Sequence, residues 1–307
     1  LRLPGRAYWP SLGLSMPEVR EVGRLMAPRL LGVAVVQLNF LINTLLASFQ
    51  PEGSITAISL AFPLMLMPEA AIAQSIAIAS LPTFAAQVAK NQINEMRASF
   101  SAALRMTLLL AVPAAIGLIL LREPLVALLY QGRQFTEHST QMVAWALLWY
   151  AVGLVGHSLV DVTSRSFYAL HDTRTPVVVG VGAMTLNLAF SFIFTALFRR
   201  AGWMPHGGLA LANSAATILE SILLLTLLRR KLNGLEEKKI IKALAKSLIA
   251  GLAMGALVWF LSERLSARPL IIRDGIAILA GIMSYGLLLI ILRTEELKKI
   301  RNLVLKY

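Results

Sequence analysis

The sequence predicts an all-α polytopic membrane protein with about eight transmembrane helices. Hydrophobic residues make up 57% of the 307 residues and charged residues only 15%, whereas a soluble domain carries roughly 25% charged residues. Apolar tracts of the length needed to cross a hydrocarbon core, about 20 helical residues, recur along the chain. We therefore expect the bilayer to be the solvent for most of this protein.

Eight apolar tracts are long enough, or nearly so, to form these helices. They run approximately from Met26 to Phe49, Ile55 to Pro82, Ala103 to Leu121, Met142 to Val160, Pro176 to Phe198, Gly207 to Leu228, Ile240 to Leu261 and Leu270 to Leu292. Arg105, Lys242 and Lys246 shorten the uncharged stretches of the third and seventh tracts. Basic side chains near a helix end can reach the membrane interface, so both tracts are retained.

The distribution of basic residues predicts the orientation of the chain. If all eight tracts cross, 22 of the 29 Lys and Arg residues lie on the side that holds both ends, and 7 lie on the opposite side. The positive-inside rule then places both ends in the cytoplasm. This asymmetry explains the net charge of +13 better than nucleic-acid binding, which needs a basic face with side chains that reach bases.

Polar segments divide the chain into three parts. Residues 1–25 are expected to form a cytoplasmic or interfacial amphipathic lead-in, because Ser15 and Glu18 have capping-box spacing before an apolar stripe. The longest polar connector, residues 229–239, separates a six-helix transmembrane lobe at 26–235 from a final pair of helices and a basic cytoplasmic tail at 236–307.

Sequence signatures of enzymes and cofactor sites are missing. The chain has no cysteine and four scattered histidines, which excludes thiolate metal sites and leaves little for a zinc or iron centre. It also lacks a Walker A loop, a dinucleotide fingerprint, a nucleophile elbow and an HExxH motif. We expect no cofactor, no metal site and no enzymatic activity.

Two acidic residues within the apolar tracts are functional candidates, because a carboxylate in the bilayer is costly unless it faces a cavity or a partner. Glu69 follows Pro68 midway along the second tract, and the alternative is that the helix breaks at its prolines so that Glu69 merely meets water. Glu220 lies nearer the cytoplasmic end of the sixth tract. We expect both carboxylates to face polar or lobe-interface surface rather than lipid.

Amide, imidazole and guanidinium groups are further candidates. Four asparagines in the spans could coordinate an ion, but interhelical hydrogen bonds are their commoner role; these are Asn39, Asn43, Asn187 and Asn213. His157 is expected to be a hydrogen-bonded core residue rather than a proton relay. Arg24 and Arg29 border the first tract, where they could bind phosphate bidentately or serve only as topology anchors.

Several segments resemble the MviN/MurJ-type lipid II flippases of the multidrug, oligosaccharidyl-lipid and polysaccharide exporter superfamily. The most specific is SFYALHDTRTPV at Ser166 to Val177, and LINTLLASF at Leu41 to Phe49 and LLYQGRQFT at Leu128 to Thr136 support it. Family members have fourteen membrane helices in two six-helix lobes plus a final pair. The resemblance therefore implies that this chain is the second lobe with that pair, and that a first lobe is missing from it.

The resemblance also implies a function. The family moves an undecaprenyl-linked peptidoglycan precursor, lipid II, across the bacterial cytoplasmic membrane by alternating access, driven by membrane potential or ion gradients. The anionic head group passes through a cationic cavity, so Arg24, Arg29 and Glu69 become candidates for substrate binding. Implied partners are this precursor, membrane lipids, the missing lobe and cell-wall synthesis proteins, with no nucleic acid.

One position departs from the family pattern. Pro63 stands where the family usually has an arginine of the cavity, just before a Leu-Met pair. Two alternatives therefore remain beside the flippase, namely a related polysaccharide or multidrug exporter and a non-transporting cell-wall scaffold.

Overall fold

The computed structural model describes residues 34, 37–132, 134–265 and 269–292, which are helical apart from short connectors. The lead-in at residues 1–25, the two candidates Arg24 and Arg29, and residues 293–307 of the basic tail lie outside these described residues. Residues 37–48 are helical. The helices that follow are α2 (Ser54–Glu69), the π-helical turn η1 (Ala70–Gln74), α3 (Ser75–Ala89), α4 (Ile93–Tyr130), α5 (Glu137–Ala169), α6 (Arg174–Arg200), α7 (His206–Lys231), α8 (Glu237–Arg264) and α9 (Leu270–Ile291).

The all-α membrane fold is confirmed. Seven helices in the described part of the chain are long and apolar enough to cross a membrane, with α2, η1 and α3 together forming the first of them. They correspond to the second to eighth predicted tracts. The helical residues 37–48 belong to the first tract, of which the earlier part lies outside the described residues.

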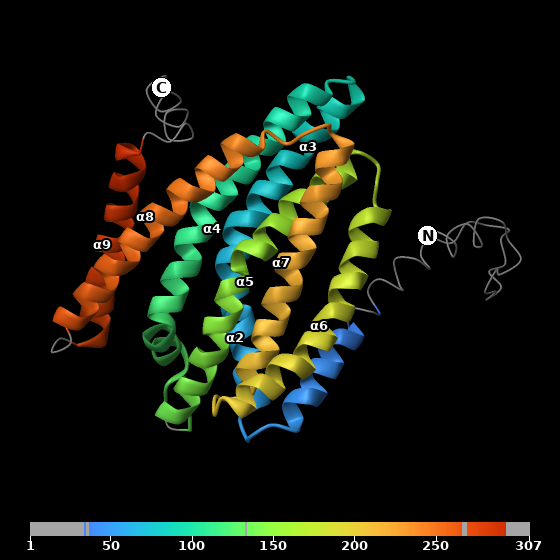
Figure 1. The fold of residues 1–307 in the computed structure, drawn as a ribbon. Coiled ribbons are helices and arrows are strands. Elements are labelled where there is room, and N and C mark those ends of the chain that lie inside the picture. Colours follow the sequence, from blue (N-terminus) through green and yellow to red (C-terminus); the bar gives the residue numbers. More distant parts are fainter. Residues whose placement is uncertain (1–33, 35–36, 133, 266–268, 293–307) are drawn as a thin grey trace, which may run out of the picture.

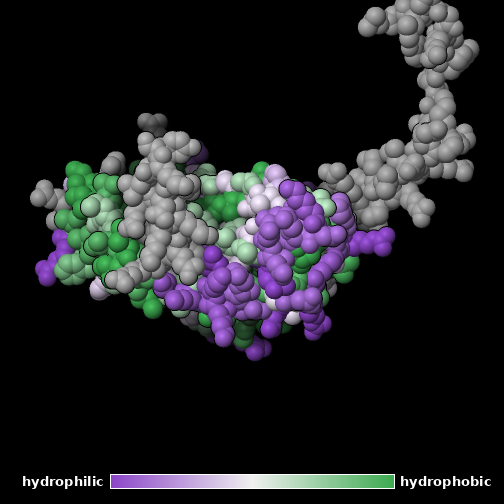
Figure 2. All heavy atoms as spheres, turned by 90° about the horizontal axis from the view of Figure 1, so that it is seen from above, coloured by the Kyte–Doolittle hydropathy of each residue, from purple (hydrophilic) through white to green (hydrophobic). Residues whose placement is uncertain are grey.

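Neighbouring helices run antiparallel because short connectors join them. The connectors at residues 90–92, 170–173 and 232–236 gather at one end of the molecule, shown uppermost in Figure 1. Seen from that end, hydrophilic side chains gather on part of the surface beside apolar ones (Figure 2). Helices α2 to α7 form the main bundle, whereas α8 crosses it obliquely and α9 lies beside α8 on the flank (Figure 1).

The second predicted tract forms one continuous helix despite its prolines. Pro63 and Pro68 lie inside α2, and Pro82 lies inside α3. A proline within a helix removes one backbone donor and crowds the preceding turn. The π-helical turn η1 follows directly after Glu69 and joins α2 to α3, and such single turns occur inside longer helices. The prolines therefore do not break the helix at Glu69.

The final helix pair packs on α4 through both apolar and polar contacts. Met254 and Val258 of α8 form a buried cluster with Leu109 of α4 and with α9. The Tyr285 hydroxyl of α9 donates to the Leu109 carbonyl at 2.6 Å and lies 2.9 Å from the Ser247 hydroxyl of α8. These hydrogen bonds satisfy polar groups in an apolar setting, which fixes the position of α9 against α4 and α8.

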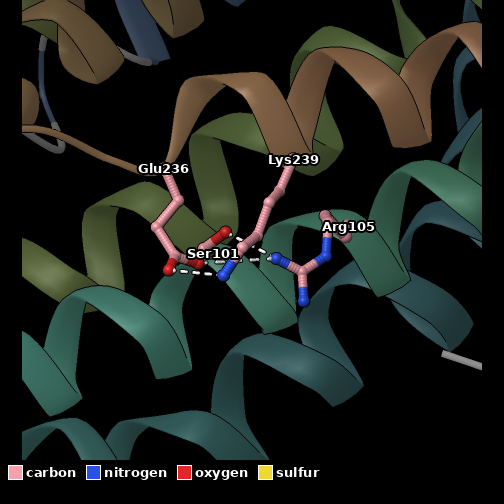
Figure 3. A network of polar contacts seen from close by, with 4 residues as sticks. All are labelled: Ser101, Arg105, Glu236 and Lys239. Carbon is pink, nitrogen blue, oxygen red and sulfur yellow. Dashed lines mark hydrogen bonds and ion pairs between the residues drawn. The ribbon is translucent and has the colours of Figure 1, made fainter. Parts of the chain in front are cut away.

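A polar network also anchors the beginning of α8 to α4 (Figure 3). Arg105 is 6% exposed, and its Nη1 lies 2.7 Å from the Ser101 hydroxyl and 3.7 Å from Glu236 Oε2. Glu236 precedes α8 and its other oxygen accepts from Lys239 Nζ at 2.7 Å. The hydrogen bond from Lys239 is the largest cause of the lowered pKa of Glu236. Partial burial acts in the opposite direction, and the hydrogen bond from Ser101 and the positive charge of Arg105 help to outweigh it.

We expect Glu236→Gln to destabilise the protein, because it removes a carboxylate from a buried guanidinium while keeping the size of the side chain. The expected loss is on the order of 1–3 kcal/mol, seen as a lower unfolding temperature in detergent. Glu123→Gln is the matched control, since Glu123 is an exposed partner of Arg122 and should change stability by less than about 0.5 kcal/mol. Equal unfolding temperatures for the two variants would contradict the anchoring role.

Candidate functional site

A cavity of about 270 Å³ opens between residues 37–48, α2, α5, α6 and α7. It joins helices that are far apart in the sequence, so only the folded bundle creates it. All five residues that the sequence singled out as ion-binding or interhelical candidates line it, namely Asn39, Asn43, Asn187, Asn213 and Glu220. The cavity is therefore the candidate functional site of the described part of the chain.

Three of the asparagines form one hydrogen-bonded network between residues 37–48 and α6. Asn39 Oδ1 accepts from Asn43 Nδ2 at 3.0 Å and from Asn187 Nδ2 at 3.3 Å. The Ser191 hydroxyl lies 3.1 Å from both Asn43 Oδ1 and Asn187 Oδ1, and Asn39 Nδ2 donates to the Met184 carbonyl at 3.0 Å. Because the amides satisfy one another, the network holds the two helices together.

The fourth asparagine connects α7 to α5. Asn213 Oδ1 lies 3.1 Å from His157 Nε2, and the Thr217 hydroxyl lies 3.4 Å from the same nitrogen. The Phe62 ring of α2 packs against the imidazole with the ring centroids 6.2 Å apart. His157 is therefore a hydrogen-bonded residue on the wall of the cavity.

Glu220 is the acidic residue of this wall. One of its carboxylate oxygens lies 3.3 Å from the position that a Cβ atom would take at Gly180 of α6, so the side chain leans across the space left by that glycine. Within the described ranges, the carboxylate has no hydrogen-bond or ion-pair partner. Glu220 is therefore the acidic group of the described cavity wall that the described residues leave unpaired.

The described lining of the cavity contains no lysine or arginine. Pro63, where the resemblance implied an arginine, is an exposed residue of α2 and is not part of the described lining. Its neighbour Phe62 lines the cavity instead and packs on Tyr150, with ring centroids 5.1 Å apart. Among the described residues, the wall of this cavity is thus acidic and aromatic rather than basic.

Glu69 lies outside this cavity, in the contact between α2 and α5. It is 3% exposed, and its Oε2 accepts from Gln74 Nε2 at 3.2 Å. Asp161 of α5 interacts with the Glu69 carboxyl, and its Oδ2 is buried without a hydrogen-bond partner among the described residues. Glu69 is therefore buried inside the protein beside a second acid.

Asp161 was missing from the residues singled out by the sequence. Because the fourth apolar tract ends at Val160, the sequence predicts that Asp161 begins a connector. In the structure α5 continues to Ala169. The spacing of four residues between His157 and Asp161, which puts both on one face of a helix, is the signal that could have found it.

Comparison with known families decides which protein family this fold represents. The family model described as lipid II flippase MurJ matches residues 5–278. The chain belongs to the MurJ family. A probable MurJ of Vibrio cholerae is 31% identical over 301 residues, covering 94% of this chain and 55% of that protein. The MurJ of Burkholderia cenocepacia is 33% identical over 222 residues, covering 72% and 42%.

A solved MurJ structure shows the same fold. The chain of lipid II flippase MurJ in an inward closed conformation is 24% identical, with a TM-score of 0.75 over 95% of this chain and 57% of that one. A transporter of the wider superfamily from Pyrococcus furiosus superposes with a TM-score of 0.60 at 17% identity. The present chain spans about half the length of the MurJ proteins that it matches.

The segment SFYALHDTRTPV, which carried much of the resemblance in the sequence, has a structural role here. His171 takes a left-handed conformation with φ of 57°, which turns the chain between α5 and α6. Asp172 then accepts from the backbone N–H of Thr175 at 3.0 Å and from its hydroxyl at 2.8 Å, and Lys231 of α7 donates to the same carboxylate at 2.7 Å. The segment thus fastens the start of α6 to the end of α7.

We expect Asp172→Asn to weaken this link in a pH-dependent way. Partial burial alone would raise the pKa of Asp172, but the hydrogen bonds from Lys231 and Thr175 lower it from 3.8 to about 2. Because the folded pKa is depressed, its stabilisation is complete above the unfolded value and is lost as the pH falls towards 2. At pH 6 the unfolding temperature of the native protein should be higher than that of Asp172→Asn, and this difference should be smaller at pH 3. A gap independent of pH would contradict the role of the charge.

Proposed function

We propose that this chain is the second six-helix lobe, with the final helix pair, of a MurJ-type flippase. In this proposal the lobe comprises residues 26–235 and the final pair lies within 236–307, preceded by the lead-in at 1–25. The match to the MurJ family over residues 5–278 carries the proposal, and the fold supports it. The transported molecule would be lipid II, the molecule named in the descriptions of the relatives, moved across the membrane by alternating access.

The proposed location is the bacterial cytoplasmic membrane, with both ends of the segment in the cytoplasm. The excess of basic residues on that side supports this orientation. Exposed residues such as Arg229, Arg230 and Lys238 flank the connector at 232–236, which lies at the upper end of the molecule in Figure 1. This end would then face the anionic lipid of the inner leaflet.

The roles of individual residues belong to the same proposal. Arg24 and Arg29 would contact the phosphates of the substrate. Glu69 would form part of the polar path along which the head group of the substrate crosses the membrane. The partners would be the preceding lobe, membrane lipids and cell-wall synthesis proteins. The MurJ family is a family of transporters, so the activity proposed here is movement of substrate without a catalytic step.

The proposal is tested by expressing the complete gene that encodes this chain in cells depleted of their own lipid II flippase. We expect the native gene to keep the cells alive. A second arm carries Pro63→Arg, which restores the residue typical of the family. Failure of both forms, with the protein shown to be present in the membrane, would refute the flippase and favour the related exporter or the scaffold.

A further inference from the structure

Two acidic side chains meet inside the helical bundle, at the contact between α2 and α5. Glu69 is 3% exposed, and the carboxyl group of Asp161 lies within hydrogen-bonding reach of its carboxyl group. Gln74 Nε2 donates to Glu69 Oε2 at 3.2 Å. Asp161 Oδ2 is buried and has no donor among the described residues. A carboxylate can only accept, so the contact between the two acids lacks a hydrogen.

The surrounding helices supply no positive charge to this pair. Helices α3, α4, α5 and α7 pack against α2 and η1, and α3 has no titratable side chain. Arg105 of α4 pairs with Glu236, and Arg165 of α5 lies over the Tyr168 ring, 5.8 Å from its centroid. Within the described ranges, no lysine or arginine forms an ion pair with either acid.

His157 is the described titratable side chain that interacts with the pair from outside it. It lies one helical turn before Asp161 on α5 and interacts with its charge. The imidazole is hydrogen-bonded to Asn213 and lines the cavity. Glu220 of α7 also lines the cavity and would add a negative charge rather than a positive one. The charge of the two acids is therefore left to be balanced by an ion that binds between them.

The contacts of the pair favour a proton over a metal ion. Two carboxylates in contact inside a protein repel each other, and a single proton allows one to donate to the other. Hard cations such as Ca²⁺ and Mg²⁺ need about six or more oxygen ligands, whereas the described residues include no group of three or more acidic or histidine side chains that could hold a metal ion. Gln74 also offers the pair an N–H group rather than its carbonyl.

We propose that Glu69 and Asp161 bind one proton between them and that this proton holds α2 and η1 against α5. One carboxyl group carries the proton and donates it to the other, so the pair has one negative charge instead of two. Release of the proton leaves two like charges in contact, which favours opening of the helix contact at η1. The inference rests on the proposed function and adds that the rearrangement of helices in transport is coupled to a proton.

The first test detects the proton by infrared spectroscopy, with the protein made from the complete gene in lipid nanodiscs at pH 7. A protonated carboxyl group has a C=O stretching band distinct from those of carboxylates. The difference spectrum between native protein and Glu69→Gln should contain this band. Asp161→Asn should shift or remove it, because the hydrogen bond between the acids is lost. Glu123→Gln changes an exposed acid and should leave it unchanged.

The second test measures the effect of the proton on the helix contact. Amide hydrogen exchange in residues 69–75 reports local opening at η1. After correction for the intrinsic pH dependence of exchange, the native protein should exchange roughly tenfold faster at pH 9 than at pH 6, which corresponds to about 1.4 kcal/mol in the free energy of opening. In Glu69→Gln the corrected rate should not depend on pH, because the pair can no longer hold two charges.

Several results would overturn the inference. A native protein without the band, or a band unchanged in Asp161→Asn, would show that the acids share no proton. Loss of the band on addition of CaCl2 or NaCl at pH 7 would indicate a metal site instead. Equal pH dependence of exchange in native protein and Glu69→Gln would refute the coupling to η1.

The same protein separates this inference from the proposed function. If it shows the band and the pH-dependent exchange but does not rescue flippase-depleted cells, the proton site stands and the flippase proposal fails. If it rescues the cells without the band, the flippase proposal stands and the proton site fails.

Discussion

Replacing Gly208 with alanine is expected to destabilise the bundle strongly. A Cβ atom at this position would lie 2.6 Å from the backbone nitrogen of Thr195 and 2.7 Å from the carbonyl carbon of Phe194. Both contacts are with the backbone of α6, which cannot rotate away as a side chain could. The helices α6 and α7 would have to separate, at a cost of about 1–3 kcal/mol or more.

Gly182→Ala is the matched control for this prediction. Gly182 also lies in a membrane helix, α6, but a Cβ atom there would have no neighbour within 4 Å. Alanine favours a helix over glycine by about 1 kcal/mol, so this variant should be as stable as the native protein or slightly more so. The measurement is the unfolding temperature of each purified variant in one detergent. Equal melting of the two variants would contradict the close approach of α6 and α7.

Glu69→Leu is expected to raise stability and lower transport together. Glu69 is buried against Asp161 and holds one hydrogen bond from Gln74. A carboxyl group buried beside another acid is costly to hold in an apolar setting, and replacing buried polar or ionic groups with apolar residues of similar size is often neutral or stabilising, by about 1–4 kcal/mol. A residue that lowers stability at a buried position is expected to be kept for function. The Glu69→Leu variant should therefore rescue flippase-depleted cells less well than the native protein does.

Glu69→Gln separates the two effects. It keeps the shape of the side chain and an acceptor for Gln74 while removing the second acid beside Asp161. We expect stability between that of the native protein and that of Glu69→Leu, measured by thermal unfolding, with rescue reduced in both variants. Full rescue by Glu69→Leu would show that this carboxylate has no part in transport.

The sequence predicted the membrane helices well because a long apolar tract has few alternatives to a spanning helix. It predicted the ends of those helices poorly. The third tract was placed at Ala103 to Leu121, whereas α4 runs from Ile93 to Tyr130. Charged residues such as Glu95 and Arg97 end a hydrophobic tract but not a helix, since a helix can continue beyond the hydrocarbon core.

The candidate site was predicted in its parts but not as a whole. The asparagines and Glu220 stood out because polar groups are rare in apolar tracts. That they share one cavity depends on how residues 37–48 pack with four further helices, α2, α5, α6 and α7, and sequence spacing within each helix does not contain that information. Phe62 and Tyr150 could not be separated from core aromatics in the sequence, and no sequence pattern indicated the π-helical turn η1.

The most direct test of the flippase proposal measures the substrate itself. In cells depleted of their own flippase, lipid II on the outer leaflet can be quantified by adding an enzyme that cleaves lipid II but does not cross the membrane. We expect expression of the complete gene to restore cleavage of newly made lipid II. Lipid II that stays protected from the enzyme while the protein is present and folded in the membrane would contradict the proposed transport.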